Sequence, residues 1–331
     1  MLHRVTADSP MQSHRFLSSE EVLLRLESRL GRLHVRLRLG LEREHEAQAF
    51  GQGLTFLHLE NMPIMQMAIE IVLRASGIYW RGRSNAAKVV VRRNTVHLPA
   101  LPASFDGFTI FHVSDLHADM SQAALERAAE LANDLRYDLC VLTGDFRGRT
   151  HGDFVPALEL VATLREALRG DIYAVLGNHD SIAMVPDLEA LGISFLLNES
   201  VAIKKGKDSV YLAGVDDAHF YRADNIEKAA ADIPEEGVSI LLSHTPEIYR
   251  QAAHAGFDLM LSGHTHGGQI CLPGGAPIML EANLPRALGA GTWRHEGMVG
   301  YTSVGVGSSV VPVRFNNRPE ITLHRLVREA R

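Results

Sequence analysis

Short apolar runs alternate with longer amphipathic stretches from residue 89 to the C-terminus. The apolar runs predict strands that end in polar or glycine-containing turns, and the amphipathic stretches predict helices that cover the resulting sheet. The predicted strands are 89–91, 108–115, 137–145, 172–176, 194–197, 211–215, 238–243, 259–262, 301–304 and 321–326. The predicted helices are 122–135, 155–168, 186–191, 226–231 and 247–253. This alternation is typical of the α/β class, in which helices pack on the faces of a sheet.

Residues 1–84 have a different pattern and predict a small N-terminal appendage, either α+β or helical, ahead of a larger domain over 85–331. Ser18 and Glu21 have the spacing of a capping box in front of an apolar helix face, which predicts the start of a helix. Residues 35–41 then alternate valine or leucine with arginine at several positions. A period of two indicates a strand in this segment.

A second amphipathic segment follows in the N-terminal region. Asn61 can cap a helix that has Pro63 in its first turn and ends at Gly77. With Arg74 and Trp80 nearby, this helix fits either a neighbouring protein surface or a membrane interface. The chain has no uncharged run long enough to span a bilayer, and its first residues lack the apolar core of a secretory signal. We therefore expect a cytoplasmic protein, with peripheral contact to the inner face of the membrane as the alternative.

Polar residues that can bind metal follow the predicted strands at their carboxyl ends. They are Asp115, His117, Asp145, Asn178, His179, His244, His264 and His266. In α/β sheets this edge is where ligands bind, so separate loops are expected to bring these side chains to one rim. Within each of the pairs Asp115 and His117, and His264 and His266, positions two apart in extended chain face the same side.

The chemistry of this set indicates which metals it suits. Imidazole, carboxylate and one amide oxygen, without thiolate, favour Mn, Fe or Zn over Ca or Mg. The only cysteines, Cys140 and Cys271, are far apart and predict neither a disulfide framework nor a thiolate site. Mn, Fe or Zn is therefore the expected type of cofactor.

Charge is distributed unevenly along the chain, whose formal net charge is -6. Residues 1–95 carry 14 Lys+Arg against 9 Asp+Glu, whereas the remainder carries 19 against 30. The weakly basic first part favours anionic partners such as a lipid headgroup surface. The acidic remainder argues against a general nucleic-acid binder, so no nucleic-acid partner is expected.

The order of the polar motifs resembles one known family. SDLH at 114–117, GD at 144–145, GNHD at 177–180, His244 and GHTH at 263–266 are similar to the motif set of the calcineurin-like metallophosphoesterases. The resemblance covers residues 85–331 and implies a four-layer αββα sandwich that hydrolyses phosphate esters. The segments GHTHGGQICLPGG at 263–275 and VPVRFNNRPEITL at 311–323 further resemble a bacterial phosphodiesterase branch. That branch includes the UDP-2,3-diacylglucosamine pyrophosphatases of lipid A synthesis.

The resemblance also implies a role for each residue. One metal would be held by Asp115, His117 and His266, and the other by Asn178, His244 and His264. Asp145 would bridge the two metals. His179 would act as the catalytic residue that contacts the phosphate and protonates the leaving alkoxide, a contribution of about 10² to 10⁴ in rate.

The sequence departs from the family pattern after the GD motif, where relatives often carry a second acidic residue that orients the catalytic histidine. Arg147 stands near that position, and either Asp153 or Asp180 could substitute for the missing carboxylate. Arg147 and Arg149 could instead hold a second phosphate, as guanidinium groups do.

Asp119 lies close to the predicted site, in the segment HAD. It fits either a partner of a metal-binding histidine or the cap of the helix predicted from residue 122.

Three functions fit these observations. The first is hydrolysis of a phosphodiester or pyrophosphate bond, with the lipid-linked nucleotide UDP-2,3-diacylglucosamine as the leading substrate. The second keeps this chemistry for a cyclic nucleotide or another small diester, and an apolar surface beside the metals would separate the two. The third is a non-catalytic scaffold, which the complete set of ligand residues disfavours.

Overall fold

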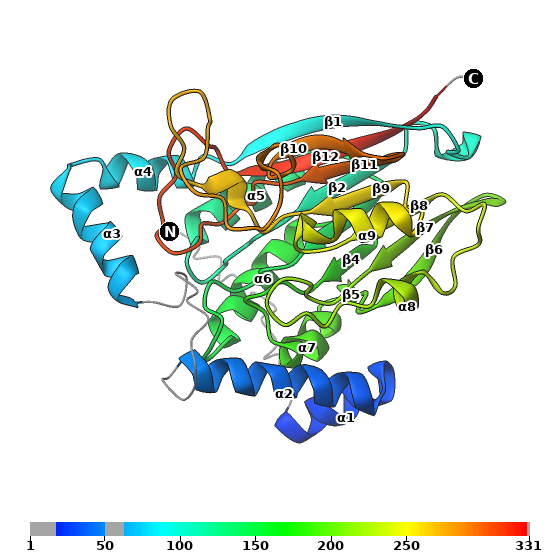
Figure 1. Cartoon of the computed structure of the whole chain (residues 1–331), viewed down its shortest axis with the longest axis horizontal. Helices are drawn as coiled ribbons and strands as arrows, with labels where there is room; N and C mark the ends of the chain where they lie inside the picture. Colours follow the sequence, from blue (N-terminus) through cyan, green and yellow to red (C-terminus); the bar gives the residue numbers. More distant parts are fainter. Residues whose placement is uncertain (1–17, 50–62, 330–331) are drawn as a thin grey trace, which may run out of the picture.

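The computed structural model describes residues 18–49 and 63–329, and its strands form two six-stranded sheets (Figure 1). The first sheet has the order β1 (Val90–Leu98), β12 (Glu320–Arg328), β2 (Thr109–Val113), β3 (Leu139–Thr143), β4 (Ile172–Val175) and β5 (Ser194–Phe195). The second has the order β10 (Gly291–His295), β11 (Met298–Thr302), β9 (Leu259–Ser262), β8 (Ser239–Leu242), β7 (Asp208–Gly214) and β6 (Glu199–Lys205). Strands β2 to β5 are parallel to one another, as are β7, β8, β9 and β11.

The two sheets pack face to face, and helices cover their outer faces. Ile110 and Val141 belong to the apolar core between the sheets, whereas their neighbours Phe111 and Cys140 belong to the core under the helices. This alternation follows from the period of two along a strand. The helices on the first sheet are α5 (Gln122–Asn133), α6 (Val155–Ala167) and α7 (Val185–Ala190), and those on the second are α8 (Ile226–Ala230) and α9 (Tyr249–His254). The predicted four-layer α/β sandwich is confirmed.

Four helices form the described N-terminal part. They are α1 (Ser19–Leu30), α2 (Arg32–Ala49), α3 (Pro63–Ala75) and α4 (Tyr79–Ala86). The predicted capping box of Ser18 and Glu21 is present at the start of α1. Asn61, the predicted cap of α3, lies outside the described residues. No helix in the described ranges combines the length and the apolar character that a bilayer crossing requires.

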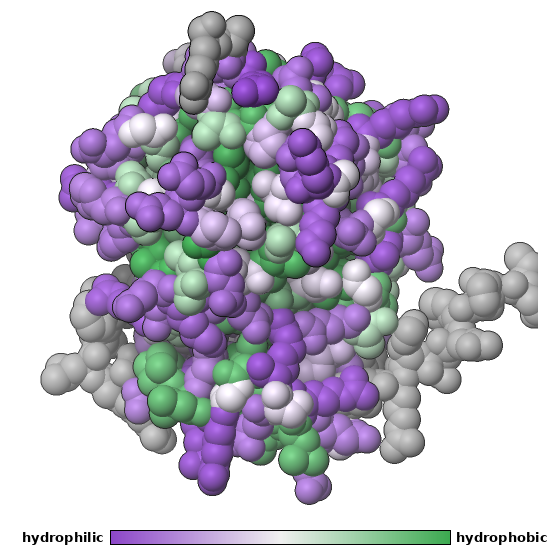
Figure 2. Space-filling model, turned by 90° about the vertical axis from the view of Figure 1, so that its right-hand side faces the viewer, coloured by the Kyte–Doolittle hydropathy of each residue, from purple (hydrophilic) through white to green (hydrophobic). Residues whose placement is uncertain are grey.

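The strand predicted at 35–41 is wrong, because this segment lies within α2. Val35 and Arg38 are buried on one helical face, whereas Leu33 and Leu37 are 84% and 56% exposed. The period of two arose because a buried arginine and exposed leucines reverse the usual pattern of helix faces. Figure 2 shows hydrophobic side chains at the lower end of the molecule, over α1 and α2.

Arg38 is fully buried and connects α2 to the sandwich. Its guanidinium lies 3.3 Å from Asp216 Oδ1 and 2.7 Å from Glu42 Oε1, and it donates to the carbonyl oxygen of Asp180 at 3.0 Å. Glu42 also accepts a hydrogen bond from the backbone nitrogen of Ile182 at 2.8 Å. Helix α2 therefore binds the backbone at Asp180, the last residue of the GNHD segment, and at Ile182, two residues later.

We expect Arg38→Leu to lower the free energy of unfolding by about 3 to 5 kcal/mol, because removing one partner leaves a buried charge uncompensated. Burial alone would lower the pKa of Arg38, but the carboxylates of Asp216 and Glu42 raise it, so the guanidinium stays charged. Urea unfolding followed by circular dichroism measures the change. Arg36→Leu on the same helix is the control, since the Arg36 side chain is 60% exposed. Equal losses in both variants would contradict this role for Arg38.

Candidate metal centre

The predicted site residues all lie in loops just beyond the carboxyl ends of strands. Asp115 and His117 follow β2, Asp145 follows β3, Asn178 and His179 follow β4, His244 follows β8, and His264 and His266 follow β9. Because β2, β3 and β4 are parallel neighbours, and β8 and β9 likewise, each sheet delivers its loops to one edge. The two sheets meet there, since the backbone nitrogen of His264 donates to Asp115 Oδ1 at 2.9 Å. All of these residues are at most 6% exposed.

Asp145 lies at the centre of the cluster. Its Oδ2 is 3.2 Å from His244 Nε2 and 3.5 Å from His117 Nε2. Three groups of side chains in the described part of the chain are close enough to share an ion, and Asp145 belongs to two of them, one with His117 and His179 and one with His244 and His264. The third group consists of Asp115, His117 and His266. The Asp145 carboxylate is thus close both to His117 and to His244, which belong to different groups of possible ligands.

The charges in this cluster are strongly coupled. Burial alone would raise the pKa of Asp145, but attraction to His244 lowers it well below its ordinary value. Burial would correspondingly lower the pKa of His244, but Asp145 raises it to about 10. Burial also raises the pKa of Asp115 to about 6. Asp145 is therefore an ionised carboxylate in a buried space lined by imidazole rings, and these are ligand types that bind divalent transition metals.

The donor atoms fit a bound divalent metal. His244 Nδ1 donates to the carbonyl oxygen of Thr143 at 2.7 Å. When the ring loses its second proton, as a metal ligand must, the lone pair of Nε2 faces Asn178 Oδ1, 2.9 Å away. Two electron-pair donors that face each other need a cation or a proton between them. In addition, Asp115 Oδ2 is buried and has no hydrogen-bond partner among the described residues. Such an oxygen is costly unless a cation compensates it.

The loops that carry the site have an unusual backbone conformation. Five of the predicted ligands have positive φ angles, a region that residues other than glycine seldom adopt. They are Asp115 (52°), His117 (39°), Asp145 (56°), His264 (70°) and His266 (48°). Strain of this kind costs about 1 to 3 kcal/mol per residue and concentrates at functional sites.

Two glycines allow the loops to approach one another. A Cβ at Gly263 would overlap Ser114 Oγ and Asp115 Oδ2, and one at Gly177 would overlap Asp145 Oδ1. These contacts explain why the turns before His264 and Asn178 have a residue without a side chain.

Comparison with known proteins agrees with this geometry. Residues 108–268 match the family described as calcineurin-like phosphoesterase. An uncharacterized metallophosphoesterase of Bacillus subtilis, YkoQ, is 32% identical over 249 residues, which cover 71% of this chain and 90% of that protein. This chain belongs to the calcineurin-like metallophosphoesterases.

Two further relatives are informative. The phosphodiesterase YaeI of Escherichia coli is 28% identical over 66% of this metallophosphoesterase and 82% of its own length. A transmembrane protein with metallophosphoesterase domain from Danio rerio is 29% identical over 78% of this chain, which covers 61% of that protein. This metallophosphoesterase is therefore a metal-dependent phosphoesterase, and the alternative of a non-catalytic scaffold is not supported.

The structure corrects the expected partner of His179. Asp180 accepts hydrogen bonds from the backbone nitrogens of Asp145 and Gly177, both at 2.8 Å, and so ties two loops together. Asp153 accepts from the backbone nitrogen of Val155 at 3.0 Å, at the start of α6. Neither carboxylate orients the His179 ring. A hydroxyl is in contact instead: Thr150 Oγ1 lies 3.2 Å from His179 Nδ1.

Arg147 does not hold a phosphate, contrary to one of our expectations. It is 4% exposed, and its guanidinium donates to the carbonyl oxygens of His179, Thr150 and Gly152 at 2.5, 2.5 and 3.0 Å. The Arg147 side chain thus joins the backbone at His179 to the backbone of residues 150–152. Arg149 is exposed, and its phosphate-binding role stays a prediction.

Asp119 has neither of the two expected roles. Its Oδ1 accepts from the backbone nitrogen of Gly148 at 2.6 Å and so joins the loop after β2 to the loop after β3. The N-cap of α5 is Ser121, whose side chain does not form the capping hydrogen bond.

Sequence reasoning missed two residues that support the His266 loop. Arg314 is fully buried, and its Nη2 lies 3.2 Å from His266 Nδ1 and donates to the carbonyl oxygen of Val304 at 2.7 Å. Asn317 Nδ2 donates to the carbonyl oxygen of His266 at 2.6 Å. Both lie in the segment VPVRFNNRPEITL, which carried part of the family resemblance. The segment itself could be recognised in the sequence, but nothing there indicated which residues its polar side chains would contact.

Proposed function

We propose that this metallophosphoesterase binds two divalent cations, of Mn, Fe or Zn, through the residues assigned from its sequence. Asp115, His117 and His266 would hold one, Asn178, His244 and His264 the other, and Asp145 both. The central position of Asp145 between two groups of imidazoles carries this proposal. When bound, such a pair of cations supplies Lewis acidity toward phosphoryl oxygens and activates water at neutral pH.

His179 is proposed to move a proton to the leaving oxygen of the substrate. Its backbone nitrogen donates to Asp145 Oδ1 at 3.0 Å, and its Nε2 lies 4.0 Å from Asp145 Oδ2, so the ring is at the edge of the metal cluster. Thr150 Oγ1 contacts the other ring nitrogen. A ring held by its Nδ1 side can present Nε2 to a substrate as a general acid.

The reaction we propose is hydrolysis of a phosphodiester or pyrophosphate bond. The name of the Escherichia coli relative, a phosphodiesterase, supports a diester over a monoester. The proposed substrate is a lipid-linked nucleotide such as UDP-2,3-diacylglucosamine, which would place the enzyme in lipid A synthesis. A cyclic nucleotide or another small diester is the alternative.

An exposed apolar surface favours the lipid substrate. Helices α3 and α4 project from the sandwich in Figure 1. On them Met67, Ile71, Val72 and Trp80 are between 59% and 65% exposed. Arg74 lies on the same helix as three of them and stacks over the ring of Tyr79. Apolar side chains next to arginine are typical of peripheral contact with a bilayer, and we propose that contact here.

The experiment compares substrates on Mn-loaded enzyme. We expect turnover of bis-p-nitrophenyl phosphate to exceed that of p-nitrophenyl phosphate, and turnover of UDP-2,3-diacylglucosamine in vesicles to exceed both. Val72→Glu should lower turnover of the vesicle substrate by about tenfold, since it places a charge in the proposed contact, while leaving the soluble diester unaffected. Faster hydrolysis of the monoester would contradict the diester assignment. Equal effects of Val72→Glu on the vesicle substrate and on bis-p-nitrophenyl phosphate would contradict the membrane contact.

A further inference from the structure

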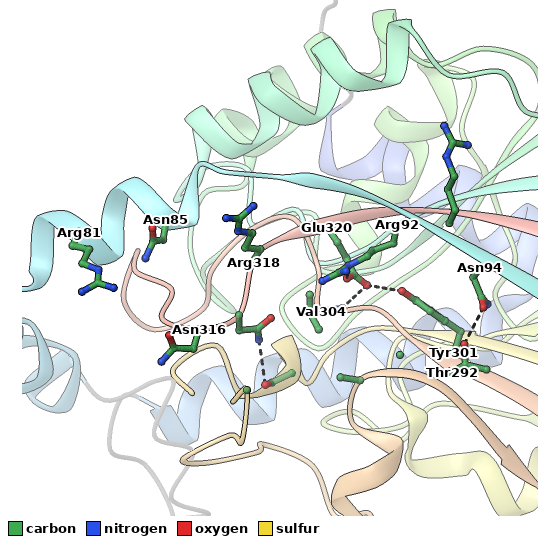
Figure 3. A pocket seen from close by; sticks show the side chains of 16 residues that line it. Arg81, Asn85, Arg92, Asn94, Thr292, Tyr301, Val304, Asn316, Arg318 and Glu320 are labelled. Carbon is green, nitrogen blue, oxygen red and sulfur yellow. Dashed lines mark hydrogen bonds and ion pairs between the residues drawn. The ribbon is translucent and has the colours of Figure 1, made fainter. Parts of the chain in front are cut away.

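A cavity of about 840 Å³ lies at the open edge of the sandwich, outside the metal cluster. Strands β1 and β10 approach each other here, and Thr292 Oγ1 donates to Asn94 Oδ1 at 2.9 Å. Helix α4 and residues 316–318 close one end (Figure 3). The volume is in the range of small-molecule sites.

Arginines dominate the charge of this cavity. Four of them line it, Arg81, Arg92, Arg93 and Arg318, against one carboxylate, Glu320. Glu320 Oε2 lies 3.4 Å from Arg92 Nε. Among the described residues no carboxylate pairs with Arg81 or Arg318. Figure 3 places these two arginines at the end of the cavity away from Asn94 and Tyr301. This end therefore carries positive charge that the protein does not neutralise.

The two arginines are carried by segments that are fixed to each other. The backbone nitrogen of Arg314 donates to the carbonyl oxygen of Gly82 at 3.0 Å, and Asn85 Nδ2 donates to the carbonyl oxygen of Arg314 at 3.3 Å. A Cβ at Gly82 would lie within 2.8 Å of atoms of Phe315, so α4 packs closely on this segment. The backbones that carry the guanidinium groups are thus held in place before any ligand binds, which lowers the entropic cost of binding.

We propose that this cavity binds a phosphate-bearing anion between Arg81 and Arg318. Planar guanidinium groups recognise phosphate oxygens through paired, charge-assisted hydrogen bonds. The site is independent of the proposed phosphodiesterase reaction, because none of the predicted metal ligands lines it. It nevertheless shares a wall with the metal loop, since Gly267, which lines the cavity, directly follows His266.

The phosphate can belong to a soluble molecule or to a lipid headgroup. Trp80, next to Arg81, is 65% exposed, and Ile278 and Met279, in the loop that also carries the cavity residue Gly275, are 59% and 55% exposed. These side chains suit a lipid surface, whereas the volume of the cavity also suits a free phosphorylated molecule. Both sources have the same phosphate chemistry, and the experiment separates them.

The test is calorimetric titration of the metal-loaded enzyme with inorganic phosphate. We expect two binding events in the wild type, one at the metal centre and one in the cavity. The double variant Arg81→Gln and Arg318→Gln should keep the first and weaken the second by about tenfold or more, because it removes both charge-assisted contacts. The control is Arg25→Gln with Arg136→Gln, which removes the same charge from exposed positions outside the cavity. Metal content and circular dichroism should match the wild type in both variants.

Sedimentation with vesicles identifies the source of the phosphate. Binding to phosphatidylglycerol but not phosphatidylcholine vesicles, lost in the cavity variant and competed by inorganic phosphate, indicates a lipid headgroup. Phosphate binding that depends on Arg81 and Arg318, without vesicle binding that depends on them, indicates a soluble ligand. Phosphate binding in the wild type that does not depend on Arg81 and Arg318, or equal weakening in the control variant, would overturn the proposal. A single site that is lost in the cavity variant would support it and would instead contradict phosphate binding at the metal centre.

Discussion

Asp145→Ala is expected to remove both metal ions and to lower turnover by about 10³-fold or more, which corresponds to about 4 kcal/mol in the activation barrier. Its Oδ2 lies 3.2 Å from His244 Nε2 and 3.5 Å from His117 Nε2, and those rings belong to the two proposed metal positions. Without the Asp145 carboxylate, the two groups of ligands lose the anion that they share. The imidazole rings then remain close together without that negative charge. Metal analysis of the purified variant and turnover of bis-p-nitrophenyl phosphate measure the two effects.

Asp153→Asn is the matched control for Asp145. Asp153 lies in the same loop region, but its side chain accepts a hydrogen bond from the backbone nitrogen of Val155 and has no recorded contact with the cluster. We expect this variant to keep its metal and its activity. If Asp145→Ala retains two ions for each chain, the bridging role of Asp145 is wrong, whatever happens to turnover.

His179→Ala is expected to lower turnover by about 10² to 10⁴, the usual range for loss of a general acid, while most of the metal is retained. The close position of His179 to Asp145 and His117 also permits the competing role of a metal ligand. Metal analysis separates the two roles, since a ligand would take its ion with it. Loss of both ions in His179→Ala would refute the assignment as an acid.

The leaving group provides a second measurement for His179. A p-nitrophenolate leaves readily without a proton, whereas an alkoxide needs one. The defect of His179→Ala should therefore be much smaller for bis-p-nitrophenyl phosphate than for a dialkyl diester. Equal defects for the two substrates would indicate that His179 positions the phosphate rather than protonates the leaving oxygen.

Much of the sandwich and the approximate location of the site could be predicted from the sequence. The apolar runs of β3, β4, β8 and β9 are short and continuous, and that of β2 is broken only by His112. A polar residue follows each run, so the sequence indicated both the strands and the sheet edge at which their loops lie. Parallel strands place their carboxyl ends together, which is why loops far apart in sequence could be assigned to one cluster.

The remainder could not be predicted, because it depends on contacts between distant segments. Asp180 was one of two carboxylates that could orient the His179 ring, but backbone nitrogens of two loops donate to its carboxylate. Arg147 was expected to be able to reach a phosphate, but carbonyl groups surround it. Residues 35–41 were predicted as a strand because valine and leucine alternate with arginine there. The burial of Arg38 depends on Asp216, which lies far along the chain. A local pattern contains no information about such partners.

The burial of Arg38 has a practical consequence for shortened versions of this enzyme. The segment shared with the family begins at residue 108, and a protein engineer would naturally trim everything before the first strand. Such a truncated product would expose the interior carboxylate of Asp216 and release the carbonyl group of Asp180. The first helices therefore belong in any minimal expressed fragment, even though they contribute none of the proposed metal ligands.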